Sequence, residues 1–231
     1  MGASSTLVLA LNGRSKPEYL AAAYGMVFAA GGVALEQWLT GSWRWVWLAD
    51  LLVMSVAGVI LAPMALPILP VETYIHYSAA LGIAPHTSEP KQLDKLPQFY
   101  ADKFGWQDKA AAVAYVFHAL TPQGQAKCAL FGDNHGRCGA INFYGAGYEL
   151  PKSIGRHNSY WIWGPRDYTG ELMLVLGGDL EDKRAIFESV EVAGVVHSKY
   201  CMPYENDLRI YISRKLKVPL KEPRPKLKSF G

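Results

Sequence analysis

The sequence predicts a membrane α-helical hairpin followed by a small soluble α/β domain. The charge distribution indicates the division, because only six of the 23 basic and 20 acidic residues lie within residues 1–71. Two uncharged runs, 19–35 and 51–71, occupy most of that part. The remaining residues alternate short apolar runs with stretches of helical spacing, which is typical of an α/β sheet.

The two uncharged runs have the length of membrane helices. About 20 apolar residues cross a hydrocarbon core, so the run 51–71 is sufficient by itself. The run 19–35 reaches that length only by continuing past Glu36. We therefore expect transmembrane helices at 19–39 and 48–71. A single span and a soluble helical hairpin are the alternatives, although a core helix normally keeps one polar face.

Aromatic residues flank these runs. Four of the seven tryptophans lie between them: Trp38, Trp43, Trp45 and Trp47. A second group, Tyr74, His76 and Tyr77, follows the second run. Indole and phenol rings favour the membrane interface, where the ring is apolar and the polar group stays hydrated. A tryptophan-rich core loop is the alternative interpretation.

The rest of the chain is expected to form a linker and a domain. Residues 72–97 read as an interfacial segment and linker, with Pro85, Pro90 and Pro97 in its second half. Residues 98–231 read as the soluble α/β domain. We expect helices over 106–120, through 139–143 and, capped by Asp179, over 180–188. Strands are expected at 127–131, 172–176, 190–196 and 208–212.

Composition excludes several classes of function. A net charge of +3 is too small for a nucleic-acid-binding face. Three cysteines, Cys128, Cys138 and Cys201, leave at least one unpaired and have no zinc-site spacing. We therefore expect no metal and no cofactor, and we expect three small, partly buried thiols.

Several phrases resemble one family. They are FGDNHGRCGAINFYG at 131–145, HNSYWIWGP at 157–165, SVEVAG at 189–194, MPYEN at 202–206 and LNGRSKPEYL at 11–20. Together they resemble the carboxyl-terminal part of bacterial membrane glycosyltransferases related to protein O-mannosyltransferases and aminoarabinose (lipid A) transferases. Residues 1–18 then correspond to an extracytoplasmic loop remnant.

The resemblance implies an activity and a place in the cell. Such enzymes transfer a sugar from a polyprenyl-phosphate carrier to a lipid or protein acceptor at the periplasmic face. It implies a multi-pass protein of the bacterial inner membrane whose α/β domain is extracytoplasmic. The family's catalytic acidic residues lie in earlier loops, so no catalytic residue is expected in this chain, which reads as a truncated or split member. A second chain would supply the missing helices. A non-catalytic, membrane-anchored module that binds glycan or a partner protein is the alternative.

Candidate binding residues fall into two groups. The resemblance assigns Tyr19, with Arg14 and Lys16 nearby, to the carrier phosphate, and cationic and phenolic donors suit that role. Interfacial anchoring is the alternative for all three.

The second group is an aromatic stretch whose rings could stack on a sugar while its amide and imidazole groups bind hydroxyls: His157, Asn158, Tyr160, Trp161 and Trp163. The alternative is a packed loop that holds the domain on the membrane part. The Gly-Asp-Asn-His-Gly turn at 132–136 is either a structural turn or a backbone cradle for phosphate at a helix start.

Overall fold

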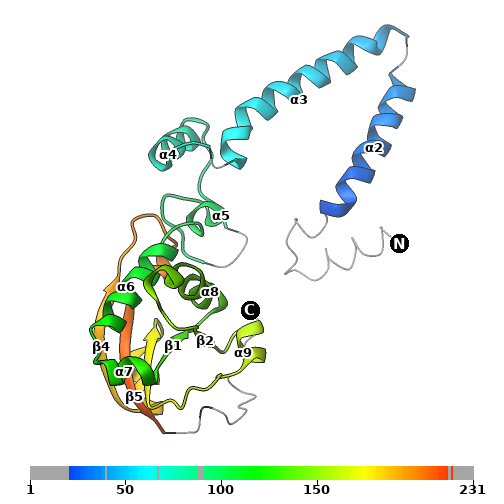
Figure 1. The fold of residues 1–231 in the computed structure, drawn as a ribbon. Coiled ribbons are helices and arrows are strands. Elements are labelled where there is room, and N and C mark those ends of the chain that lie inside the picture. The colour runs from blue at the N-terminus through cyan, green and yellow to red at the C-terminus, as the bar shows by residue number, and fades with distance from the viewer. Residues whose placement is uncertain (1–20, 40, 67, 88–90, 218–219, 221–231) are drawn as a thin grey trace. The chain divides into compact units, whose positions relative to one another are not determined.

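A computed structural model describes residues 21–39, 41–66, 68–87, 91–217 and 220 (Figure 1). Internal contacts divide the chain into two compact units, Met1–Ala84 and Pro85–Gly231. The boundary lies within the proline-bearing segment in which the sequence places a linker. Residues 85–97 are therefore part of the second unit. Each unit is described by itself below.

The first unit is helical. It contains α2 (Ala21–Trp38), the 3-10 turn η2 (Gly41–Trp43), α3 (Arg44–Ala65) and α4 (Val71–Ala80). Helix α3 begins before residue 48, where the sequence places the second span. It ends at Ala65, because Leu66 is extended. The span expected at 48–71 is therefore not one helix, because α3 ends at Ala65 and α4 begins at Val71. The Tyr77 hydroxyl donates to the Ile60 carbonyl oxygen at 2.8 Å and ties α4 to α3.

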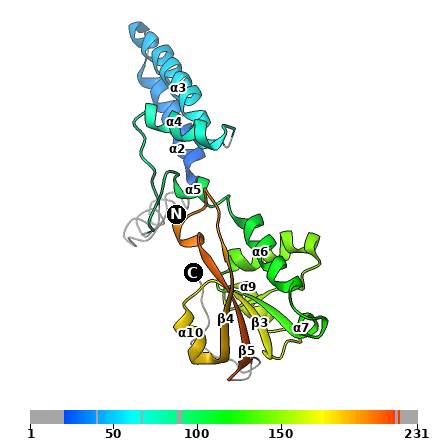
Figure 2. The same cartoon turned by 90° about the vertical axis from the view of Figure 1, so that its left-hand side faces the viewer.

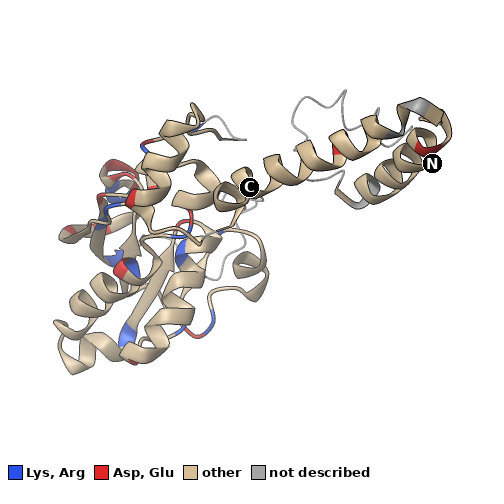
Figure 3. Ribbon diagram, turned by 90° about the horizontal axis from the view of Figure 1, so that it is seen from above, with Lys and Arg blue, Asp and Glu red and all other residues tan. Residues whose placement is uncertain are grey.

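Helix α3 presents its apolar side chains outward. Its segment Trp45–Ala65 has 21 residues and a mean hydropathy of 2.1, and none of it is buried. Among the described residues it is the one helix long and apolar enough to cross a membrane. Charged residues are sparse on α2 and α3 and numerous in the second unit (Figure 3). The two-helix membrane hairpin stays a prediction.

The second unit is built on a mixed five-stranded sheet in the order β2-β1-β3-β5-β4. Strands β1 (Cys128–Gly132), β2 (Ile154–Gly155) and β3 (Leu172–Leu176) are parallel. Strand β5 (Leu208–Leu216) runs antiparallel to β3, and β4 (Phe187–Val196) runs antiparallel to β5. The α/β class predicted for this part is therefore confirmed, and β4 and β5 make the sheet mixed rather than parallel.

Helices surround the strands. They are α5 (Gln98–Ala101), α6 (Trp106–His118), α7 (Pro122–Lys127), α8 (His135–Tyr144), α9 (Ser159–Trp163) and α10 (Leu180–Ile186), with 3-10 turns η3 (Gly145–Tyr148) and η4 (Pro203–Glu205). Side-chain caps stabilise the amino termini of two of these helices. Asn134 caps α8 by accepting from the Arg137 N–H at 2.8 Å, and Asp179 caps α10.

Two cores cover the two faces of the sheet. On one face, Val113 and Phe117 of α6 and Ile141 of α8 pack against β1, β3 and β5. On the other face, Leu180 of α10 packs with Met173 and other residues of the sheet. Figure 2 shows α6 and α10 on opposite sides of the strands. The chain therefore leaves β1 toward one face, into α8, and leaves β3 toward the other, into α10.

Most sequence-based element predictions agree with the structure. The helix expected at 106–120 is α6, and the strand expected at 172–176 has the bounds of β3. The helix expected over 180–188 was too long, because Phe187 already begins β4. Strand β2 was not predicted, since two residues carry no periodicity. All three cysteines are free and buried.

Candidate functional site

The aromatic stretch singled out in the sequence follows β2 directly and forms the short helix α9. Glycine is required where the stretch begins. A Cβ on Gly155 would lie 2.6 Å from Cys138 Sγ and 3.0 Å from the Gly132 carbonyl oxygen. Asn158 has a φ of 50° before α9, and Gly164 has a φ of 69° after it. These two residues with positive φ turn the chain sharply before and after α9. The aromatic side chains therefore extend from a short helix with a sharp turn at each end.

Asn142 of α8 braces this helix. Its Nδ2 donates to the Tyr160 hydroxyl at 3.0 Å. Its Oδ1 accepts from the backbone N–H of Ser153 at 2.7 Å and from the Ser153 hydroxyl at 3.0 Å. Tyr160 in turn meets Trp163 edge to face, with ring centroids 4.9 Å apart. Burial raises the pKa of the Tyr160 phenol, so the hydroxyl stays protonated at neutral pH.

An open pocket of about 490 Å³ lies beside this helix. Asn142, Lys152, Trp163 and Arg166 line it. Trp163 offers an exposed indole face, and Asn142 offers an amide. Lys152 and Arg166 add two cations. The pocket thus combines an aromatic platform with donors for hydroxyl or anionic groups, which is the pattern of a polar, ring-shaped ligand site. None of these lining side chains is a carboxylate.

The imidazoles of His135 and His157 lie next to this region. Their rings are parallel to within 7°, with centroids 5.0 Å apart and an Nδ1–Nδ1 distance of 2.9 Å. One Nδ1 must therefore donate a proton and the other accept it. Burial, then His135 and Arg156, lower the pKa of His157, and Asp133 opposes them. The imidazole of His157 is accordingly neutral at neutral pH.

The predicted site residues separate into three sets. Arg14, Lys16 and Tyr19 lie outside the described residues. His157, Asn158, Tyr160 and Trp161 are in the expected segment but do not line the pocket. Trp163 does line it.

Sequence reasoning missed three of the four lining residues: Asn142, Lys152 and Arg166. Lys152 and Arg166 flank the aromatic stretch in sequence, and that proximity was the available signal. Asn142 comes from α8, and no sequence pattern connected it to α9.

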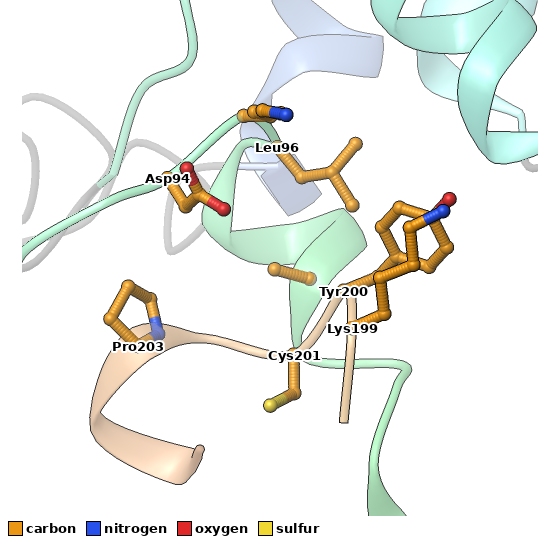
Figure 4. A pocket seen from close by; sticks show the side chains of 8 residues that line it. Asp94, Leu96, Lys199, Tyr200, Cys201 and Pro203 are labelled. Carbon is orange, nitrogen blue, oxygen red and sulfur yellow. The ribbon is translucent and has the colours of Figure 1, made fainter. Parts of the chain in front are cut away.

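A second, smaller pocket of about 70 Å³ lies between residues 94–96 and 199–203 (Figure 4). Cys201 lines it, but burial raises the pKa of its thiol. The thiol donates to the Ser198 carbonyl oxygen at 3.4 Å. A protonated, bonded thiol is a poor nucleophile, and the pocket is too small for a sugar ring.

Among residues 21–39, 41–66, 68–87, 91–217 and 220, no group of three His, Cys, Asp or Glu side chains is placed to bind a metal ion. Comparison with known proteins adds no assignment: no model of a protein family, no curated protein and no solved structure matches this chain.

Proposed function

We propose that this chain is the carboxyl-terminal part of a membrane glycosyltransferase. Its reaction moves a sugar from a polyprenyl-phosphate carrier to a lipid or protein acceptor at the periplasmic face. The observation that carries the proposal is the pocket at Trp163, where an exposed indole lies beside an amide and two cations. An indole face packs on the apolar face of a sugar, and the amide and cations bind hydroxyl or phosphate oxygens.

The first unit supports the membrane part of this proposal. In this proposal the two spans of the hairpin are residues 19–39 and α3, and α3 is an apolar, exposed helix of sufficient length. The four tryptophans between the two uncharged runs are all exposed: Trp38, Trp43, Trp45 and Trp47. Exposed indoles at the end of a hairpin suit an interface between lipid and water. The protein then resides in a bacterial inner membrane.

The binding roles divide between the units. Arg14 and Lys16, just before the first span, and Tyr19, at its start, bind the carrier phosphate. The pocket at Trp163 binds a sugar of the donor or acceptor. The chain contributes no catalytic carboxylate of its own, so a partner polypeptide with further membrane helices supplies the base. Membrane lipid is the second partner.

A transfer assay tests the proposal. Membranes are prepared from cells that express the full chain together with the polypeptide encoded immediately upstream, and radiolabelled polyprenyl-phosphate sugars are added. Trp163→Ala should raise KM roughly tenfold, because stacking and burial of one indole face contribute about 1–2 kcal/mol. Tyr19→Phe should also lower transfer. Ile162→Ala is the matched control, since Ile162 is exposed on the same helix and is not a lining residue. Transfer unaffected by both Trp163→Ala and Tyr19→Phe would overturn the assignment.

The same pocket supports a second candidate function. Because no carboxylate lines it, a membrane-anchored module that binds glycan or a partner protein without catalysis fits its chemistry as well. Such a module binds its ligand saturably in membranes that lack the upstream polypeptide, and it transfers no sugar when that polypeptide is present. Transfer activity in the assay above excludes this function.

A further inference from the structure

The buried charges of the second unit do not balance. Among the described residues, three cations are buried, Lys109, Arg137 and Lys183, against one buried carboxylate, Glu205. Removing a charge from water costs several kcal/mol unless a counter-charge or hydrogen bonds replace the water. The buried cations therefore outnumber the buried carboxylate, and the question is which of them lacks a counter-charge.

Glu205 accounts for two of the three cations. Its Oε2 lies 3.1 Å from Arg137 Nε and 3.4 Å from Lys109 Nζ. Its Oε1 accepts from Asn134 Nδ2 at 2.9 Å. The Lys109 ammonium also lies over the Trp106 ring, 4.3 Å from its centroid. This cluster links α6, α8 and η4.

Lys183 is the cation that the cluster leaves out. The residue is 8% exposed, and its Nζ lies 5.1 Å from the centroid of the Tyr211 ring. In the part of the chain that the structure describes, this ammonium has no hydrogen bond and no ion pair. Burial lowers the pKa of Lys183, and the charges of Asp133 and Asp182 oppose that effect. Asp182 itself is exposed, so water screens its charge.

The position of Lys183 is informative. Gly178, with a φ of +78°, follows β3, and a Cβ there would overlap the Lys183 ammonium. Gly177 has a φ of +81°, and a Cβ there would likewise overlap the Arg137 guanidinium. Both cations thus pass against the backbone at the carboxyl edge of the parallel strands. This is also where the connections from β1 and β3 diverge to opposite faces, which is the usual place for a ligand in an α/β sheet.

A second unsatisfied donor lies at the same edge. Arg156, which follows β2, pairs its Nη2 with Asp133 Oδ1 at 3.0 Å. Its Nε is buried and has no hydrogen-bond partner. Asp133 Oδ2 is 4.0 Å from the Cβ position of Gly178, so Asp133 lies between Arg156 and the Lys183 side of the edge. The amino terminus of α8 begins two residues later and adds its positive dipole.

We propose that the carboxyl edge of β1 and β3 is a binding site for a phosphoryl group, held by Lys183 and Arg156 beside the amino terminus of α8. A phosphate monoester is a dianion near neutral pH, and Lys183 supplies the buried positive charge that Glu205 does not pair with. Asp133 is already paired with Arg156, so the bound group adds the negative charge that Lys183 lacks. This site is separate from the pocket at Trp163 and does not depend on the transferase proposal.

The phosphoryl group has two possible sources, a soluble phosphate ester or a lipid headgroup, and two probes separate them. The full chain in an uncharged detergent is titrated with inorganic phosphate by calorimetry. It is titrated separately with dihexanoyl phosphatidic acid, with dihexanoyl phosphatidylcholine as the control lipid. Saturable binding of inorganic phosphate indicates a soluble ester. Binding of phosphatidic acid alone indicates a lipid headgroup.

Variants test the named side chains. Lys183→Met should weaken binding of the active probe roughly tenfold or more, the loss expected for one charge-assisted contact. Lys127→Met is the matched control, because Lys127 is exposed at the opposite end of β1 and is paired with Glu171. Arg156→Gln provides a second test at a side chain that is 43% exposed, so the fold should tolerate the change.

Stability separates a binding role from a structural one. Lys183→Met should leave the ligand-free protein about as stable as the wild type, since it removes a buried ammonium that has no ion pair, and that gain offsets the lost contact with the Tyr211 ring. It should abolish the rise in melting temperature that the ligand produces. Absence of saturable binding to both probes would overturn the proposal. Unchanged affinity in both Lys183→Met and Arg156→Gln would overturn it as well.

Discussion

Glu205→Gln is the substitution for which the buried charges make the strongest prediction. The amide has nearly the same shape, and its oxygen can still accept from Asn134. The loss therefore concerns Oε2, which lies 3.1 Å from Arg137 Nε and 3.4 Å from Lys109 Nζ. Two buried cations would remain without their counter-charge. Removing one partner of a buried ion pair costs about 3–5 kcal/mol, a large part of the 5–15 kcal/mol by which a typical domain is stable.

Hydrogen–deuterium exchange in increasing urea measures this loss in the full chain. Peptides from β3 and β5 report the free energy of unfolding of the second unit separately from the helices of the first unit. Lys109→Met is the comparison. It leaves the Arg137–Glu205 pair intact, and it removes a buried charge instead of leaving one without a counter-charge. It should cost less than about 1 kcal/mol or stabilise the unit. A loss below about 1 kcal/mol for Glu205→Gln, or an equal loss for Lys109→Met, would refute the reasoning.

Two further predictions concern packing and thiol ionisation. Gly155→Ala should destabilise the second unit by about 1–3 kcal/mol in urea unfolding, because its Cβ meets Cys138 Sγ and the Gly132 carbonyl oxygen. Gly139→Ala in α8 is the control: a Cβ there meets nothing within 4 Å, so the change should be neutral or stabilising. Burial raises the pKa of Cys128 to about 12 and that of Cys138 to about 11. The unfolded chain therefore loses these protons first, so unfolding free energy should fall as pH rises above about 9, by about 1.4 kcal/mol per pH unit for each thiol. Replacing both thiols by alanine should flatten that slope, and an unchanged slope would contradict the assignment.

Local sequence signals predicted the elements that are continuous in sequence. The run 172–176 is buried at every position in β3, because both faces of that strand are covered. Asp179 was recognised as a helix cap, since its side-chain chemistry acts within a few residues. Strand β2 lacked such a signal: its two residues are defined by pairing with β1, which is more than 20 residues away.

The candidate sites show the same distinction. Trp163 could be chosen from the sequence because it belongs to an aromatic stretch whose rings could stack on a sugar. Asn142 could not, because its amide acquires a role only where α8 packs beside α9. Lys183 was passed over for a similar reason: in sequence it is an ordinary lysine of a charged helix, and it becomes unusual only because the fold buries it beside Gly178.

The sequence by itself determined the division of the chain into an apolar third and a charged α/β part, along with most of the strands and helix caps. These features depend on composition and on neighbours within one or two turns, so they can be read along the chain. Only the tertiary structure decided the strand order, the pocket beside α9 and the excess of buried positive charge at the edge of β1 and β3. Each of these arises where segments distant in sequence exclude water together, and solvent exclusion is a property of the packed domain rather than of any one segment.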